Sequence, residues 1–154
     1  MPGRFAPLEA FLEAIATADV TNVLCLVSDE EIAGKSPDYL AMIHRNEFPV
    51  QLWRFDIPDY GMPTNVDDLD QMLDWLLERL RLGESLVIHC AAGHGRTGMV
   101  ATLLLARMGS PLDDAIETIR LAGLAPDTME QRGFLRKRVA AWSPAPSGTG
   151  LHGS

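Results

Sequence analysis

The sequence predicts an α/β fold in which one central, mostly parallel sheet is flanked by helices. Short apolar runs typical of buried strands alternate along the chain with longer segments of helical periodicity. Strands separated by helices pair in parallel, because each helix carries the chain back across the sheet. The length of 154 residues and the apolar fraction of 47% suit one folded domain with a proper core.

The first half of the chain supplies two of the expected strands. The expected elements are a helix over 8–18, a strand over 22–27, helices that open at Ser28 and at Ser36-Pro37, and an alternating strand over 50–55. Ser28 precedes Glu31 by three positions, the spacing of a capping box at a helix start. Proline is favoured at the first position of a helix, so the second short helix begins at Pro37 and runs to about residue 45.

The second half is mostly helical. Pro58, Gly61 and Pro63 predict a loop over 57–64, and the next segment, 65–82, has one apolar and one acidic face and ends before Gly83. Further expected elements are a strand over 85–89 and helices over 96–108, from Ser110-Pro111 to about 122, and over 127–142. We expect a domain over 1–142 and a disordered tail over 143–154, which is rich in Pro, Ser and Gly.

Composition limits the possible partners. The net charge of −8 argues against nucleic acid or an anionic membrane. The sequence has no apolar run of membrane-spanning length and no secretory signal at its start. Two cysteines, Cys25 and Cys90, form no disulfide or metal-binding framework. We expect a cytoplasmic monomer with no metal or cofactor.

The segment over 89–98 reads His-Cys-Ala-Ala-Gly-His-Gly-Arg-Thr-Gly, between the expected strand and the expected helix. A strand, a tight loop and a helix N-terminus gather backbone N–H groups around one point, where a tetrahedral oxyanion can bind. The planar guanidinium of Arg96 could bind that oxyanion through two parallel hydrogen bonds. A helix N-terminus and a nearby cation also favour the thiolate of Cys90. The residues expected to hold the anion are Ala91, Ala92, Gly93, His94, Gly95 and Arg96.

This segment resembles the Cys-x5-Arg-Ser/Thr signature of the protein tyrosine phosphatase superfamily. The resemblance implies that Cys90 attacks phosphorus to form a phosphocysteine and that Arg96 binds the equatorial oxygens. It also implies that the hydroxyl of Thr97 assists the sulfur when it leaves, and that His89 orders the loop from behind. The alternative for this segment is a glycine-rich turn in which Cys90 is merely a small core residue.

Cleavage of a phosphate ester also needs a proton donor, and the loop after the second strand offers Asp56 and Asp59. Asp59 lies in mid-loop, whereas Asp56 ends the strand. The loop resembles the general-acid loop of dual-specificity phosphatases related to the cyclin-dependent-kinase-associated phosphatase, whose aspartate lies about thirty residues before the cysteine. This favours Asp59, 31 residues before Cys90. Its alternative is a solvated turn aspartate.

The segment over 127–131 resembles the family's Glu-Thr-x-x-Gln, which implies that Gln131 positions the hydrolytic water. Its alternative is an exposed polar residue on the last helix. Cys25 could form a regulatory disulfide with Cys90, as in some relatives, although a buried core cysteine is the simpler interpretation.

Three departures from the family bear on substrate choice. Only Arg120 remains where relatives often carry a second arginine, and the signature loop has no lysine. Residues 1–20 hold nothing like the loop that deepens the pocket of tyrosine-specific enzymes. The resemblance therefore implies hydrolysis of phosphotyrosine, and of phosphoserine or phosphothreonine, in proteins. The alternatives are a phosphatase of inositol phosphates or other small phosphoesters, and a non-catalytic module that reads phosphate.

Overall fold

A three-stranded parallel sheet in the order β2-β1-β3 forms the centre of the computed structural model, which describes residues 1–92 and 94–143. The strands are β1 (Asn22–Cys25), β2 (Gln51–Arg54) and β3 (Leu86–His89). In the register of the sheet, Val23 lies opposite both Leu52 and Val87. The predicted α/β class and parallel sheet are confirmed, although each strand is shorter than predicted.

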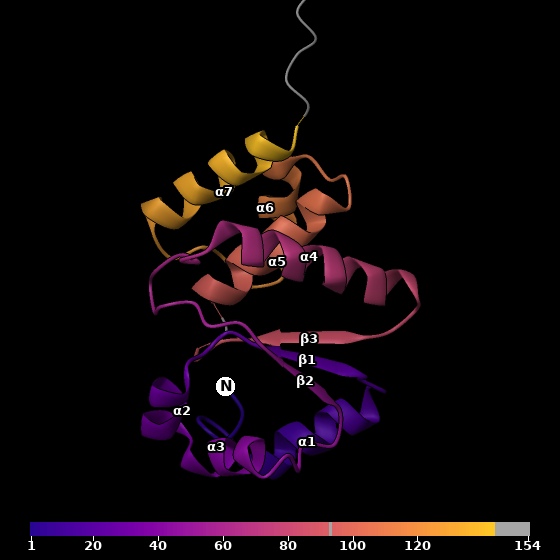
Figure 1. Ribbon diagram of the computed structural model, residues 1–154, viewed down its shortest axis with the longest axis vertical. Coiled ribbons are helices and arrows are strands. Elements are labelled where there is room, and N and C mark those ends of the chain that lie inside the picture. The colour runs from indigo at the N-terminus through magenta and orange to yellow at the C-terminus, as the bar shows by residue number, and fades with distance from the viewer. Residues whose placement is uncertain (93, 144–154) are drawn as a thin grey trace, which may run out of the picture.

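Helices cover both faces of this sheet (Figure 1). On one face lie α1 (Leu8–Thr17), α2 (Asp29–Lys35) and α3 (Pro37–His44). On the other lie α4 (Val66–Arg81), α5 (Gly95–Arg107), α6 (Leu112–Leu121) and α7 (Met129–Trp142). The central strand β1 is buried along its whole length, as expected for a strand covered on both faces.

Polar side chains start two helices where the sequence predicts them. The hydroxyl of Ser28 accepts a hydrogen bond from the Glu31 amide at 3.3 Å and caps α2. The side chain of Asn65 accepts from two amides of the first turn of α4. These bonds satisfy amide groups that a helix start leaves without an internal partner.

Two other helix starts differ from the prediction. Pro111, rather than Ser110, occupies the position before α6, and no side chain caps that helix. The last helix begins at Met129, two residues later than predicted, because Thr128 accepts from the amide of Gln131 at 3.0 Å and closes a capping box. The predicted domain end coincides with the end of α7, and the predicted tail lies outside the described residues from 144 onward.

The topology leaves a crevice at the carboxyl edge of the sheet. The chain leaves β1 into α2 on one face and leaves neighbouring β3 into α5 on the other face (Figure 1). The two loops therefore diverge, and ligands of open α/β sheets bind where this happens. Both helices also direct their N-termini toward this edge, where backbone amides and helix dipoles favour an anion.

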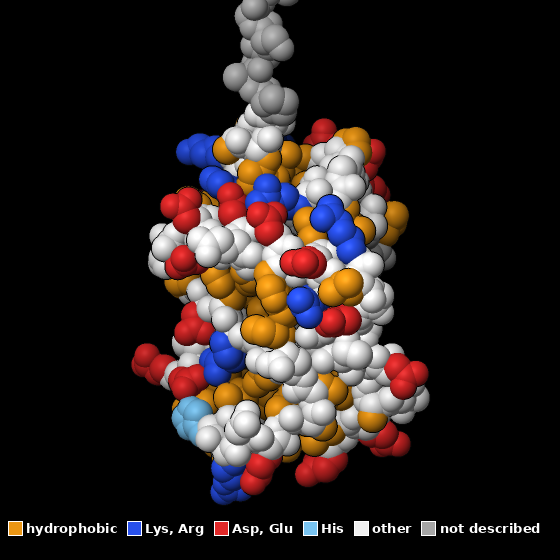
Figure 2. Space-filling model, turned by 45° about the vertical axis from the view of Figure 1, so that its right-hand side comes forward, with side chains coloured by type: hydrophobic (Ala, Val, Ile, Leu, Met, Phe, Trp, Pro, Cys, Tyr) orange, Lys and Arg blue, Asp and Glu red, His pale blue; other side chains and the backbone are white. Residues whose placement is uncertain are grey.

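The surface carries charges of both signs. Figure 2 shows acidic and basic side chains interspersed on one face of the molecule rather than gathered into one large patch. Over residues 1–92 and 94–143, no helix is both long enough and apolar enough to cross a bilayer.

Candidate active site

Cys90 follows β3 directly and opens the loop that leads into α5. Its side chain is buried, with 3% of the residue exposed, and it lines a pocket of about 180 Å³. The other residues that line this pocket are Arg4, Lys35, Asp59, Tyr60, Ala91, Ala92, His94, Gly95, Arg96 and Asp127. The predicted anion-binding residues therefore share one pocket with Cys90, except Gly93, which lies outside the described residues.

Arg96 joins three distant segments of the chain. Its two terminal nitrogens donate to the two carboxylate oxygens of Glu31, at 2.7 and 3.0 Å. One of these nitrogens also donates to the carbonyl of Ile57 at 3.1 Å, and the other lies 3.1 Å from Asp59 Oδ1. Only 3% of Arg96 is exposed, so these bonds fix the guanidinium beside the loop.

Glu31 is the counter-ion of this cation. Its hydrogen bonds to Arg96, together with a contact with Lys35, lower the pKa of the Glu31 carboxyl to about 2 against the opposing effect of burial. Glu31 is therefore ionised at neutral pH. The sequence marked Glu31 only as part of a helix start, because an ion pair between residues 65 positions apart leaves no local pattern.

Asp59 lies at the exposed tip of a tight turn. The amide of Gly61 donates to the carbonyl of Pro58 at 2.9 Å, and Tyr60 adopts a left-handed φ of +55°. The base of the loop is fixed, because the buried Ile57 donates to the carbonyl of Leu26 at 3.1 Å. The Asp59 side chain is 50% exposed while it contacts Arg96, so this side chain can leave Arg96 without opening the core.

The other carboxylate of this loop lies elsewhere. Asp56 is 3.8 Å from the Arg54 guanidinium, its side chain is 58% exposed, and it does not line the Cys90 pocket. Asp59 is thus the carboxylate of this loop that lines the pocket.

His89 supports the loop from within the core. Its Nδ1 lies 3.2 Å from the carbonyl of Cys90, and its Nε2 lies 2.8 Å from the Tyr39 hydroxyl. A carbonyl can only accept, so we assign the ring proton to Nδ1, and Nε2 then accepts from Tyr39. Burial lowers the pKa of His89 to about 4, which keeps the ring neutral near pH 7.

Thr97 stands in the first turn of α5. Its hydroxyl is buried and finds no hydrogen-bond partner among residues 1–92 and 94–143. A buried polar group without a partner costs about 1–3 kcal/mol, and such groups are often found at functional sites.

The segment before α7 contributes to the pocket through a residue that the sequence analysis did not assign. Asp127 lines the pocket and packs so closely that a Cβ on Gly95 would lie 2.0 Å from its Oδ2. Gln131 is fully buried instead of exposed. Its Oε1 accepts from the amides of Asp127 and Thr128, at 2.8 and 3.3 Å, and its Nε2 donates to the carbonyl of Gly61 at 2.9 Å.

Two further residues of the sequence analysis lie outside the pocket. Arg120 is exposed on α6 and pairs with Glu117, so it adds no charge to the pocket wall. Cys25 is a free, buried cysteine whose thiol donates to the carbonyl of Val27 at 3.8 Å. Burial raises the pKa of the Cys25 thiol, as expected for a core residue.

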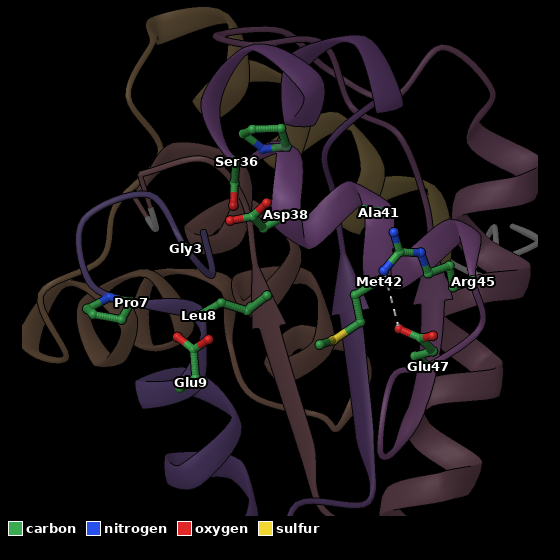
Figure 3. A pocket seen from close by; sticks show the side chains of 11 residues that line it. Gly3, Pro7, Leu8, Glu9, Ser36, Asp38, Ala41, Met42, Arg45 and Glu47 are labelled. Carbon is green, nitrogen blue, oxygen red and sulfur yellow. Dashed lines mark ion pairs between the residues drawn. The ribbon is translucent and has the colours of Figure 1, made fainter.

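A larger cleft of about 520 Å³ lies between the start of α1 and α3 (Figure 3). Its charged residues are Glu9, Asp38, Arg45 and Glu47, and Arg45 lies 4.0 Å from Glu47. Three carboxylates against one arginine disfavour an anionic ligand. The smaller pocket at Cys90 is therefore the candidate site for a phosphate group.

Comparisons with known proteins identify the family of the chain. A family model described as "Swiss Army Knife protein, DSP-PTPase phosphatase domain" matches residues 7–139. An uncharacterised protein of Methanocaldococcus jannaschii is 34% identical over 101 residues, which cover 60% of this chain and 67% of that protein.

Solved structures give the same result. The crystal structure of Tk-PTP in its active form is 30% identical, with a TM-score of 0.71 over 88% of both chains. A structure of kinase-associated phosphatase, with its catalytic cysteine replaced by serine, has a TM-score of 0.77 over 92% of this chain and 85% of that one. At 19% identity, this second likeness shows the fold alone. The family match and the likeness to Tk-PTP show that the chain belongs to the dual-specificity branch of the cysteine phosphatases.

Proposed function

We propose that this phosphatase hydrolyses phosphate monoesters in proteins, phosphotyrosine and also phosphoserine or phosphothreonine, through a phosphocysteine. The observation that carries the proposal is the convergence of Cys90, Arg96 and Asp59 on one pocket, with Asp59 Oδ1 3.1 Å from the Arg96 guanidinium. A nucleophile, an oxyanion-binding cation and a carboxylic acid are the groups that this reaction needs.

In the first step, the thiolate of Cys90 attacks phosphorus, the S–P bond forms and the ester P–O bond breaks. The leaving oxygen takes a proton from the Asp59 carboxylic acid, so an alcohol or phenol departs. Arg96 and the backbone amides of the loop bind the equatorial oxygens, whose charge they stabilise. The exposed turn that carries Asp59 supports this role, because the acid must reach a leaving group above the phosphate.

In the second step, water attacks phosphorus and the S–P bond breaks. The Asp59 carboxylate takes the proton of the water, and the thiolate of Cys90 is released with inorganic phosphate. The buried hydroxyl of Thr97, which has no partner among the described residues, is available to donate to the departing sulfur. The bond from Gln131 to Gly61 supports a positioning role for Gln131, which would act through the Asp59 loop.

The pair between Asp59 and Arg96 also has a role in substrate binding. Without substrate, the Asp59 carboxylate occupies a guanidinium nitrogen that a phosphate oxygen would need. A bound dianion would take this nitrogen and release Asp59 from its cation. Asp59 takes up a proton from solvent once it has left this cation, and the resulting carboxylic acid approaches the leaving oxygen only when substrate has arrived.

Steady-state kinetics with aryl phosphates test the proposal. Both proposed steps use only side chains, backbone amides and water, so turnover is expected in the presence of a metal chelator. We expect Cys90→Ser to reduce kcat at least 10³-fold with an unchanged circular dichroism spectrum. The matched control is Cys25→Ala, which removes the other cysteine and should retain kcat. Retained turnover in Cys90→Ser would overturn the nucleophile assignment.

The acid is tested with leaving groups of different basicity. Asp59→Asn should slow hydrolysis of alkyl and simple phenyl phosphates about 10²-fold or more, and that of p-nitrophenyl phosphate much less. Asp56→Asn removes the other carboxylate of the loop and is the matched control. An equal loss for every ester would contradict a proton donor at Asp59. A wild-type enzyme that hydrolyses inositol phosphates but no phosphopeptide would favour the small-molecule alternative.

A further inference from the structure

The first residues of the chain form a tight turn against the catalytic loop. In Met1-Pro2-Gly3-Arg4, the Arg4 amide donates to the carbonyl of Met1 at 3.2 Å, and Gly3 has a φ of +74°. Proline second and glycine third with positive φ are the signature of a type II turn. The Met1 nitrogen donates to the carbonyl of Ala91 at 3.2 Å, which ties the turn to the loop after Cys90.

The turn is also closely packed against the start of α3. A Cβ on Gly3 would lie 2.4 Å from the hydroxyl oxygen of Ser36. Arg4, which follows Gly3 in the turn, lines the Cys90 pocket. Lys35, which precedes Ser36 at the end of α2, lines it as well. Arg4 and Lys35 therefore line the same pocket as Arg96, next to a point where the turn and α3 pack closely.

These cations differ in how far their charge is already balanced. Lys35 contacts Glu31, which also binds Arg96, and lies 4.0 Å from Asp59 Oδ2. The positive charges of Lys35 and Arg96 are therefore balanced by the negative charges of Glu31 and Asp59. Arg4 has no carboxylate within ion-pair distance in the described part of the chain, and its guanidinium instead lies 4.4 Å above the Phe5 ring. Asp127 also lines the pocket, but among Arg4, Lys35 and Arg96 it is Arg4 that forms no ion pair with a described carboxylate.

Large apolar side chains accompany Arg4. Phe5, Tyr60 and Met129 are 73%, 67% and 76% exposed. Tyr60 lines the pocket, Phe5 follows Arg4, and Met129 lies two residues after Asp127, which also lines it. Exposed apolar groups around a polar pocket fit the flanking residues of a peptide better than they fit a small polyol phosphate.

We propose that Arg4 is a specificity-determining residue that binds an acidic side chain next to the phosphorylated residue of a protein substrate. The inference rests on the proposed phosphatase activity and narrows its substrates to acidic sequences. A half-buried arginine that pairs with no carboxylate of its own chain gains more from a carboxylate of the substrate than a fully exposed one does.

The test compares phosphotyrosine peptides that differ only in flanking charge. One peptide carries glutamates at the three positions on each side of the phosphotyrosine, and its partner carries glutamines there. The wild-type kcat/KM should favour the acidic peptide about fivefold, equivalent to ~1 kcal/mol. Arg4→Ala should abolish this preference and Arg4→Glu should reverse it. The ratio of the two peptides cancels any effect of the variant on the phosphate itself.

The matched control is Arg136→Ala, which removes an exposed arginine of α7 that does not line the pocket and should keep the fivefold preference. A preference that survives in both Arg4 variants would overturn the inference and leave the phosphatase activity standing. An effect of Arg4 confined to a small sugar bisphosphate would also overturn it, because the occupant would not be a peptide. A wild-type enzyme inactive on every ester would overturn the proposed function and the inference together.

Discussion

Replacement of Glu31 by glutamine would test whether its charge holds Arg96 in place. The substitution keeps the size of the side chain and one oxygen that can accept from the guanidinium. It removes the negative charge that Arg96 and Lys35 share. Arg96 would then retain the amide oxygen at position 31, the Ile57 carbonyl and the exposed Asp59 as partners, and only Asp59 would carry a charge.

The magnitude follows from the pKa of Glu31, which the bonds to Arg96 and the contact with Lys35 together lower from 4.5 to about 2. A difference of this size corresponds to about 3 kcal/mol of stability at neutral pH. Solvent reaches the carboxylate, which is 17% exposed, and screening reduces the value to about 1–2 kcal/mol. The folded-state pKa lies below the unfolded one, so this stability is present above pH 4.5 and is lost as the pH falls toward 2.

Urea denaturation at pH 7, 4 and 3 would measure the effect. At pH 7, Glu31→Gln should lower the free energy of unfolding by about 1–2 kcal/mol, and the gap from wild type should shrink by about half at pH 3. Loss of the clamp should also lower kcat/KM about tenfold, since Arg96 must be held to meet the phosphate. The matched control is Glu30→Gln, an exposed neighbour. A gap that is the same at every pH would refute a role for the charge.

Two further predictions concern packing around the site. Gly98→Ala should destabilise by about 1–3 kcal/mol in thermal or urea unfolding, because its Cβ would lie 2.9 Å from the backbone carbon of Ala125. The space around Gly34 is open, so Gly34→Ala should stabilise α2 by about 0.5–1 kcal/mol. Equal effects of the Gly98 and Gly34 substitutions on stability would contradict the packing argument. Tyr39→Phe should cost about 1–2 kcal/mol, since Nε2 of the buried His89 loses its donor; an unchanged urea midpoint would argue against that hydrogen bond.

The catalytic loop could be predicted from sequence because its pattern is local. Cys90 and Arg96 are six positions apart between an apolar strand and an apolar helix, and the structure has the same order of elements. The preference for Asp59 over Asp56 came from family spacing, and Asp59 is the one that lines the pocket. Helix starts with a clear side-chain cap, such as Ser28, were also predicted correctly.

Contacts between distant segments could not be predicted. Nothing in the sequence near Glu31 shows that it binds Arg96, and nothing near residue 127 shows that Asp127 lies against Gly95. The type II turn at Pro2-Gly3 could have been recognised from its residues, but its contact with the Cys90 loop could not. Periodicity reports which face of an element is buried, not which residue it meets.

The amide of Gln131 has a consequence for how the enzyme would fail on heating. One end of this side chain closes the start of α7 and the other end holds the turn that carries Asp59. Helix ends open at lower free energy than a buried strand does. Fraying of this terminal helix would release Asp59, the proposed proton donor, while the sheet and Cys90 stay in place. Inactivation would then precede melting, and the protein would pass through a state that still holds phosphate but no longer turns it over.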